Sequence, residues 1–485
     1  MSEESGDKLQ HIEYRDSRRA AWRVLYPGRT HGARRFVLSL LVAAGTWWLW
    51  TTVTASLPPA ERAVLFLFIL AVGLWITEAV PSFAVGLLIM GYLVFVLGTP
   101  WFLEEPMPVQ GYVDTFSSPV VWLILGGFFM AEGMARTGLD RRLFALAIGP
   151  AGNRPRNILL AVMLTSAIAS MFISNTSTTA LLITAVLPFT ARVGEEEPFS
   201  RALLVAIPFS ATVGGMGTII GSAPNAIAVG IAANSGSTVN FVEWMLIGVP
   251  VAIGMVLLGW RFILWRYPTE MEHVAVELGS DEPVALPERR ARWLVAGITA
   301  TTIGLWLTTP LHGVPVAVIS LVPIVGLSMT QVLGTQQVRS LPWDTLMLVA
   351  GGLSLGAAVV DTGLADRMAL GLSALTGIGF QPLIFLIMAL LTVVLSNFMS
   401  NTATVSLILP VAVALLPGRE LEMCLILGLS ASCALLLPVS TPPNAVAFAT
   451  GRITTADLRP IGIAAGLLGP LLIVTWVLLL SGVVR

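Results

Sequence analysis

Ser170-Met171-Phe172-Ile173-Ser174-Asn175-Thr176 interrupts one long apolar run of this chain, and Ser396-Asn397-Phe398-Met399-Ser400-Asn401-Thr402 interrupts a second. Each stretch ends in the triplet Ser-Asn-Thr. Hydroxyl and amide side chains inside a membrane-length apolar run are costly unless they bind something. Two copies in corresponding positions of two halves predict one binding site built from a repeat.

The composition predicts a membrane protein. The chain has 485 residues, of which 55% are hydrophobic and 11% are charged, whereas a soluble domain carries about 25% charged residues. Cys424 and Cys433 lie in one apolar region, so no disulfide framework or metal site is indicated. No nucleophile–base set or enzyme motif is recognisable. We therefore expect no enzyme, and we expect small-ion and lipid partners rather than nucleic acid.

Charge placement predicts the topology. Residues 1–35 form a basic arm without the pattern of a signal peptide, and residues 36–60 are expected to hold the first transmembrane helix. With a cytoplasmic N-terminus and about eleven crossings, 23 of the 27 Lys and Arg residues fall on the cytoplasmic side. The expected location is the inner (plasma) membrane, and the expected fold is an all-α polytopic membrane protein.

The two interrupted runs, 157–190 and 380–417, are each longer than one crossing. Each run can be a re-entrant hairpin, which enters and leaves on one side, or two full crossings. Both return the chain to its starting side, so the charge bias argues against a single crossing in each run but does not choose between these two arrangements.

An internal repeat is visible by eye. Thr137-Gly138-Leu139 corresponds to Thr362-Gly363-Leu364, and Leu125-Gly126-Gly127 corresponds to Ala350-Gly351-Gly352. With hairpins, each half has five crossings, and an odd number predicts an inverted repeat. The expected boundaries are 61–266 for the first repeat, 267–292 for a cytoplasmic linker and 293–485 for the second repeat.

The chemistry of the paired sites favours an anion together with a cation. A helix that begins after Asn175 or Asn401, with Thr176 or Thr402 at its start, presents free N–H groups and a positive dipole end, which suit an anion. Gly221-Ser222-Ala223-Pro224-Asn225 and Ser440-Thr441-Pro442-Pro443-Asn444 are expected to break two further helices, and freed carbonyls suit Na⁺. No Lys or Arg lies in these motifs, so a co-bound cation would supply the positive charge.

At these residues the chain resembles the divalent anion/sodium symporter family, which carries di- and tricarboxylates and sulfate. The heptapeptide Trp75-Ile76-Thr77-Glu78-Ala79-Val80-Pro81 joins the triplets and Pro-Asn breaks in this resemblance, over about 62–484. The resemblance implies a homodimer in which a transport domain moves past a scaffold domain, as an elevator. It implies substrate ligands at Ser174, Asn175, Thr176, Ser400, Asn401, Thr402, Thr441 and Pro442. It implies one Na⁺ site at Ser170, Ser174, Asn175 and Gly221, and another at Ser396, Ser400, Asn401 and Ser440.

We therefore predict sodium-coupled symport of C4 dicarboxylates such as succinate, malate and fumarate. A sodium-independent dicarboxylate exchanger, or a sodium-coupled citrate or sulfate carrier, is the alternative. Ser222-Ala223 stands where the family more often has Thr-Pro, which leaves the symmetry of the pocket wall open. An anion channel is less favoured, because two tips that close on one site leave no continuous polar pore.

Overall fold

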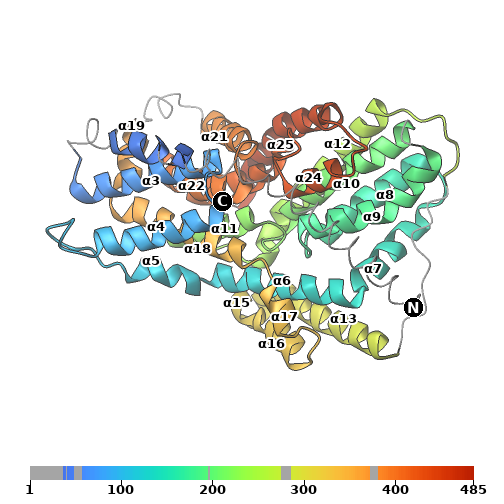
Figure 1. The fold of residues 1–485 in the computed structure, drawn as a ribbon, viewed down its shortest axis with the longest axis horizontal. Helices are drawn as coiled ribbons and strands as arrows, with labels where there is room; N and C mark the ends of the chain where they lie inside the picture. The colour runs from blue at the N-terminus through green and yellow to red at the C-terminus, as the bar shows by residue number, and fades with distance from the viewer. Residues whose placement is uncertain are drawn as a thin grey trace, which may run out of the picture.

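The computed structural model describes residues 37–39, 41–48, 57–194, 197–274, 286–371 and 381–484. All regular secondary structure in these segments is helical, as predicted. Many of the helices run roughly along the long axis of the molecule (Figure 1). The basic arm 1–35 and residues 275–285 of the linker 267–292 lie outside the described residues.

The helices follow one order that is used twice. The first half contains α3 (Pro59–Thr77), α4 (Ser82–Leu97), α5 (Gln110–Asp114), η1 (Thr115–Ser117), α6 (Pro119–Thr137), α7 (Leu139–Ile148), η2 (Gly149–Ala151), α8 (Pro155–Ser170), α9 (Asn175–Val193), α10 (Pro198–Gly214), η3 (Gly215–Gly217), α11 (Ala223–Asn234) and α12 (Phe241–Arg266). The second half contains α13 (Leu286–Leu307), α14 (Thr309–His312), α15 (Val316–Ile319), α16 (Leu321–Met329), α17 (Thr335–Arg339), α18 (Trp343–Asp361), α19 (Leu364–Gly371), α21 (Gln381–Ser396), α22 (Asn401–Leu415), α23 (Glu420–Ser430), η4 (Ala431–Cys433), α24 (Pro442–Phe448) and α25 (Thr455–Val484).

Both triplets lie at the tip of a helical hairpin. Helices α8 and α9 pack against each other around one tip, and α21 and α22 do so around the other. Helix α8 has 16 residues, which gives about 24 Å at 1.5 Å per residue. The hydrocarbon core of a bilayer is about 30 Å thick. These lengths favour re-entrant hairpins over double spans, the alternative that charge placement left open.

The duplicated glycines let the two halves approach closely. Helices α6 and α18 occupy equivalent positions in the two halves. Helix α18 packs on α4 of the first half, and α6 packs on α15 and α16 of the second half. A β-carbon on Gly351 would lie 2.3 Å from the Cα of Gly86, and one on Gly126 would lie 2.7 Å from the Cβ of Ser320. Only glycine fits at either contact, which explains part of the repeated Gly-Gly motif.

The second repeated glycine makes a turn. Gly138 has φ of 61° and Gly363 has φ of 79°, a region that L side chains rarely adopt. Gly138 ends α6 before α7, and Gly363 separates α18 from α19. The apolar run 344–372 is therefore not one continuous helix but a long helix followed by a short one.

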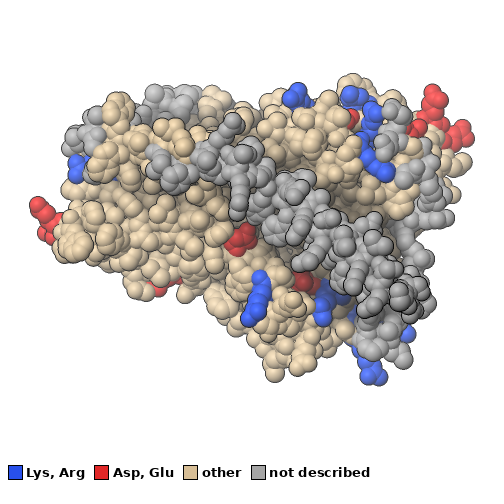
Figure 2. All heavy atoms as spheres, viewed as in Figure 1, with Lys and Arg blue, Asp and Glu red and all other residues tan. Residues whose placement is uncertain are grey.

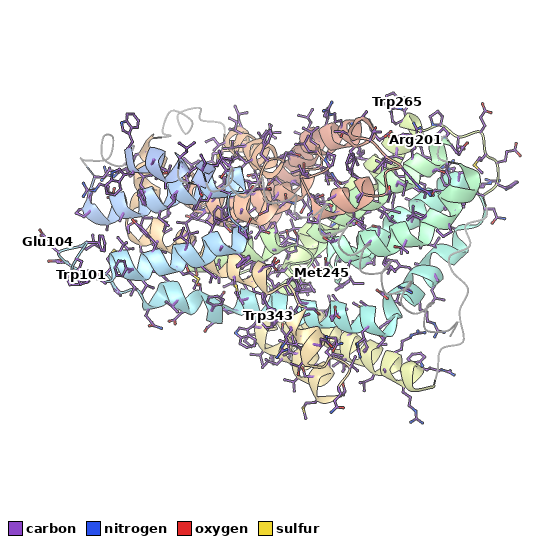
Figure 3. The ribbon with its side chains drawn as sticks, in the orientation of Figure 1. Trp101, Glu104, Arg201, Met245, Trp265 and Trp343 are labelled. Carbon is purple, nitrogen blue, oxygen red and sulfur yellow. The ribbon has the colours of Figure 1, made fainter. Side chains whose placement is uncertain are left out.

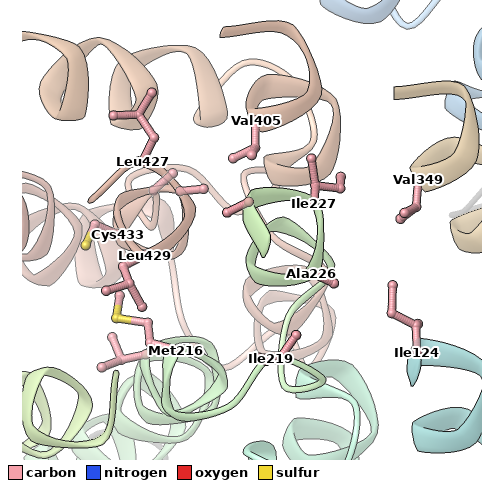
Figure 4. Close-up of a cluster of buried hydrophobic side chains, with 14 of the residues drawn as sticks. Ile124, Met216, Ile219, Ala226, Ile227, Val349, Val405, Leu427, Leu429 and Cys433 are labelled. Atoms are coloured by element: carbon pink, nitrogen blue, oxygen red, sulfur yellow. The ribbon is translucent and has the colours of Figure 1, made fainter. Parts of the chain in front are cut away.

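The core lies where the halves meet. Ile124 of α6, Val349 of α18, Ile227 of α11 and Val405 of α22 are each at most 3% exposed, and their side chains project into the space between these helices (Figure 4). Dense packing of this kind fixes the relative positions of the hairpins and the broken helices.

Among the described residues, six helices are long and apolar enough to cross a membrane: Pro59–Thr77, Gln110–Thr137, Pro198–Gly217, Phe241–Arg266, Trp343–Asp361 and Thr455–Ser481. Shorter apolar helices, including Ser82–Leu97 and Val316–Met329, accompany them. The face drawn in Figure 2 carries charged side chains only at scattered places. These features support a multi-pass membrane protein.

Candidate functional site

The first tip is a capped helix start. Ser174 is the N-cap of α9, and its hydroxyl accepts a hydrogen bond from the backbone N–H of Ser177 at 3.5 Å. Asn175 and Thr176 form the first turn of α9 and are half-buried, whereas Ser174 is exposed. The first turn of a helix has N–H groups without intrahelical partners. Anions bind readily at such a position.

Behind this tip, three of the four residues expected to bind sodium converge. The hydroxyl of Ser170 donates to Oδ1 of Asn175 at 2.5 Å. A β-carbon on Gly215 would lie 2.7 Å from Oδ1 of Asn175 and 2.8 Å from the carbonyl oxygen of Gly221. The two oxygens therefore border the same point. Ser170, Asn175 and Gly221, predicted as sodium ligands, are brought together, and Gly215 leaves the space between them open.

Asn225 and Thr218 hold the break in place. The amide of Asn225 donates to the carbonyl oxygens of Gly215 at 2.9 Å and Thr218 at 2.8 Å. Thr218 donates its hydroxyl hydrogen bond to the carbonyl oxygen of Met171, at the hairpin tip. The non-helical segment between η3 and α11 is thus tied to the first tip, and the Gly221 carbonyl keeps a defined direction.

The second tip repeats the cap but not the internal hydrogen bond. Ser400 is the N-cap of α22, and its hydroxyl accepts from the N–H of Ala403 at 3.2 Å. The hydroxyl oxygen of Ser396 and Oδ1 of Asn401 are buried and have no hydrogen-bond partner among the described residues. A buried polar atom without a partner is unfavourable. A cation coordinated by both oxygens would remove this cost.

Asn397 ties the second tip to its own broken helix. Its Oδ1 accepts from the N–H of Leu436 at 2.9 Å and from the hydroxyl of Ser440 at 2.8 Å. Asn444 donates to the carbonyl oxygens of Leu435 and Leu437, both at 3.1 Å. This arrangement matches that of Asn225, although a side chain replaces the Met171 carbonyl as the anchor.

The starts of the two broken helices differ. Thr441 is buried, and its hydroxyl accepts from the N–H of Asn444 at 3.4 Å as the N-cap of α24. Pro442 follows at the first position of α24 and is exposed. Ser222 holds the same N-cap position before α11 but makes no capping hydrogen bond with its side chain. The two halves therefore differ in how the broken helix is capped, at the position where Ser222-Ala223 replaces Thr-Pro.

The hairpins and the broken helices pack across the repeat. Helix α9 of the first hairpin lies against α24 of the second half, and α22 of the second hairpin lies against α11 of the first half. Arg452, which follows α24, donates to the hydroxyl of Thr190 near the end of α9 at 2.5 Å. The hairpin of each half therefore contacts the broken helix of the other half.

Sequence reasoning did not select Thr218, Asn225, Asn397 or Asn444 as site residues. Asn225 and Asn444 stand in the repeated Pro-Asn motif, so the repeat itself carried a signal for them. Asn397 has Met171 as its counterpart, so comparison of the halves could not reveal it.

A separate cavity of about 740 Å³ lies between α5, α11, α18 and α22. None of the candidate ligands lines that cavity.

Paired hairpin tips and broken helices in a duplicated helical membrane fold define the class of the protein as a membrane transporter. Residues 72–423 match the citrate transporter family, and residues 306–483 match it again. The chain belongs to this family, and the predicted resemblance to divalent anion/sodium symporters is confirmed.

Curated relatives cover most of the chain. A sodium-dependent dicarboxylate transporter of Staphylococcus saprophyticus is 29% identical over 84% of this chain and 84% of its own length. The transporter of the same name from Staphylococcus aureus is 27% identical over 82% of each chain. An uncharacterized transporter of Haemophilus influenzae is 28% identical over 86% of this chain and 91% of its own.

Two solved structures share the fold. The YdaH transporter of Alcanivorax borkumensis superposes with a TM-score of 0.56 at 16% identity, covering 83% of this chain and 98% of its own. MtrF of Neisseria gonorrhoeae, described as an antimetabolite efflux pump, superposes with a TM-score of 0.53 at 13% identity, covering 85% and 97%. These similarities support the fold class alone.

Proposed function

We propose that this protein is a sodium-coupled symporter of C4 dicarboxylates such as succinate, malate and fumarate. The observation that carries the proposal is the pair of buried, unpartnered oxygens on Ser396 and Asn401. Asn401 is the first residue of α22, and Ser396 lies one turn before its N-cap Ser400, at a helix N-terminus that suits an anion. The names of the Staphylococcus relatives support the same ion and the same substrate class.

The proposed substrate bridges the two tips. One carboxylate lies at the first turn of α9, with Ser174, Asn175 and Thr176, and the other at the first turn of α22, with Ser400, Asn401 and Thr402. Thr441 and Pro442 complete the wall. Because these motifs contain no Lys or Arg, two bound Na⁺ ions would balance the dianion. One ion would use Ser170, Ser174, Asn175 and Gly221, and the other Ser396, Ser400, Asn401 and Ser440.

The proposed motion is that of an elevator. The hairpins, the broken helices and α12 and α25 would move together, past a scaffold that includes α4, α6 and α18. The interface between α18 and α22 is closely packed, because a β-carbon on Gly352 would lie 2.1 Å from the Ser406 hydroxyl oxygen.

We also propose that the repeats span 61–266 and 293–485, and that the protein is a homodimer in the inner membrane with a cytoplasmic N-terminus.

Exchange without sodium is the second candidate, and one observation favours it. At the first tip Ser170 already satisfies Oδ1 of Asn175, so these two oxygens need no cation to pair them. An exchanger would bind the dicarboxylate through the helix N-termini alone and would return only when loaded.

Radiolabelled succinate uptake into proteoliposomes separates the two candidates. Symport predicts accumulation in vesicles without internal substrate when Na⁺ is higher outside, and none when K⁺ replaces Na⁺. Exchange predicts uptake that depends on internal succinate and is indifferent to Na⁺, and this result would reject the symport proposal. Citrate and sulfate as competitors test the alternative substrates.

A further inference from the structure

A groove of about 460 Å³ lies between α10, α12 and α25, apart from the candidate transport site. Its walls are apolar and include Met255, Leu258, Phe262, Ile461 and Leu468. The small residues Gly259, Ala464 and Ala465 line it and leave the space open. A β-carbon on Gly259 would lie 2.2 Å from Cε1 of Phe209, so no larger residue fits there without displacing the ring.

The groove has one charged lining residue among those described, and it is Arg261. Arg261 is exposed and belongs to the last turns of α12. No acidic side chain of the described residues lines the groove to neutralise it. Arg261 lies closer than Met255 or Leu258 to the C-terminal end of α12. A cation there, in an otherwise apolar groove, is complementary to a molecule with an anionic head and an apolar tail.

The charged end of the groove stands at the membrane–water boundary. Helix α12 ends at Arg266, and the hydroxyl of the next residue, Tyr267, donates to Oδ1 of Asp457 near the start of α25 at 3.2 Å. Trp265, which lines the groove, is 74% exposed, and exposed tryptophans at helix ends are typical of the headgroup level. Figure 3 places Trp265 near Arg201, and Trp101 and Glu104 at the opposite end of the molecule.

We propose that this groove binds a phospholipid with an anionic headgroup from the surrounding bilayer. The phosphate lies against the guanidinium of Arg261, and one acyl chain fills the apolar groove toward Met255 and Leu468. The site is independent of the substrate and sodium ligands. A zwitterionic lipid also fits the apolar walls. Its headgroup has no net negative charge to pair with Arg261, so its acyl chain alone would hold it.

Native mass spectrometry of the detergent-purified protein tests the proposal. The protein is titrated with dioleoyl phosphatidylglycerol or with dioleoyl phosphatidylcholine, which differ only in the headgroup. We expect one phosphatidylglycerol to be retained with about fivefold preference. Arg261→Gln should remove this preference. Arg266→Gln is the matched control, because Arg266 does not line the groove and lies over the Tyr267 ring at 5.2 Å.

A second variant tests the acyl chain. Ala464 lines the groove and is half-buried, so Ala464→Phe should fill the space and weaken both lipids equally while Arg261 remains. Equal retention of the two lipids by the wild type would overturn the proposal. So would a preference for phosphatidylglycerol that Arg261→Gln and Arg266→Gln reduce alike. If Ala464→Phe does not give a monodisperse protein, the arginine pair decides.

Discussion

The hydroxyl of Ser170 donates to Oδ1 of Asn175 at 2.5 Å, one turn behind the first hairpin tip. The equivalent oxygens at the second tip, on Ser396 and Asn401, are buried without a partner among the described residues. The two tips share a sequence pattern but differ in whether their oxygens are already hydrogen-bonded to each other. The second tip has its ligands free, whereas the first must break a hydrogen bond to bind an ion.

Removal of either tip asparagine should stop transport. Asn175→Ala and Asn401→Ala each delete an amide that contacts both proposed ligands, and hydrogen bonds to charged groups are worth about 1.5–3 kcal/mol. We expect succinate uptake to fall by tenfold or more in each variant, with normal expression and size-exclusion behaviour. Thr184→Ala is the control, because Thr184 lies on α9 but bonds only to the carbonyl oxygen of Ala180. Uptake at the wild-type rate in either asparagine variant would refute the site.

The serine behind each tip should set the sodium requirement. Ser170→Ala and Ser396→Ala each remove one proposed oxygen ligand, so the Na⁺ concentration for half-maximal uptake should rise about tenfold. Ser396→Ala also removes a buried unpartnered hydroxyl and should leave the thermal stability unchanged or higher. Ser170→Ala leaves Asn175 without its donor and should lower the stability by about 1 kcal/mol. An unchanged sodium dependence in both variants would contradict the assigned roles.

Asn397 should stabilise the second tip without being a ligand itself. Asn397→Met places the residue of the first tip in the second, and it leaves the N–H of Leu436 and the O–H of Ser440 without their acceptor. Each buried unpaired group costs about 1–3 kcal/mol, so the melting temperature should fall by several degrees. The neighbouring Phe398 is 60% exposed, and Phe398→Leu should have little effect. A melting temperature equal to that of the wild type in Asn397→Met would show that the tether does not matter.

The close contact between α4 and α18 should tolerate no added methyl group. A β-carbon on Gly86 would lie 2.8 Å from the carbonyl oxygen of Met347, whereas one on Gly91 would meet nothing within 4 Å. Both glycines lie on α4, so they form a matched pair. Gly86→Ala should destabilise the protein by about 1–3 kcal/mol through overpacking, and Gly91→Ala should be neutral or slightly stabilising. Thermal melting of the two purified variants in the same detergent provides the comparison.

The repeat was the part of the fold that the sequence predicted best. Duplicated motifs such as Thr137-Gly138-Leu139 and Thr362-Gly363-Leu364 mark positions where the backbone needs glycine, and such needs leave a trace in the sequence. The break between α18 and α19 falls at Thr362-Gly363-Leu364, one of these repeated motifs. The order of contacts across the halves, with α18 on α4 and α6 on α15 and α16, has no local sequence signature.

The candidate site was predictable only in part. Ser174 and Ser400 were recognisable because capping depends on residue type, and both are N-caps. The hydrogen bonds of Asn397 were not recognisable from the repeat. In the second half the acceptor is the Asn397 side chain, whereas in the first half it is the backbone carbonyl of Met171. Backbone atoms such as the Gly221 carbonyl oxygen can be assigned only when the loop conformation is known.

The most direct test of the account measures sodium movement itself. Proteoliposomes without internal substrate are given ²²Na⁺ at equal concentration on both sides and an inward gradient of succinate. The account predicts that succinate drives net ²²Na⁺ entry in the wild type and in Thr184→Ala, and that Asn175→Ala and Asn401→Ala abolish this entry. Succinate accumulation without any movement of ²²Na⁺ would contradict the account.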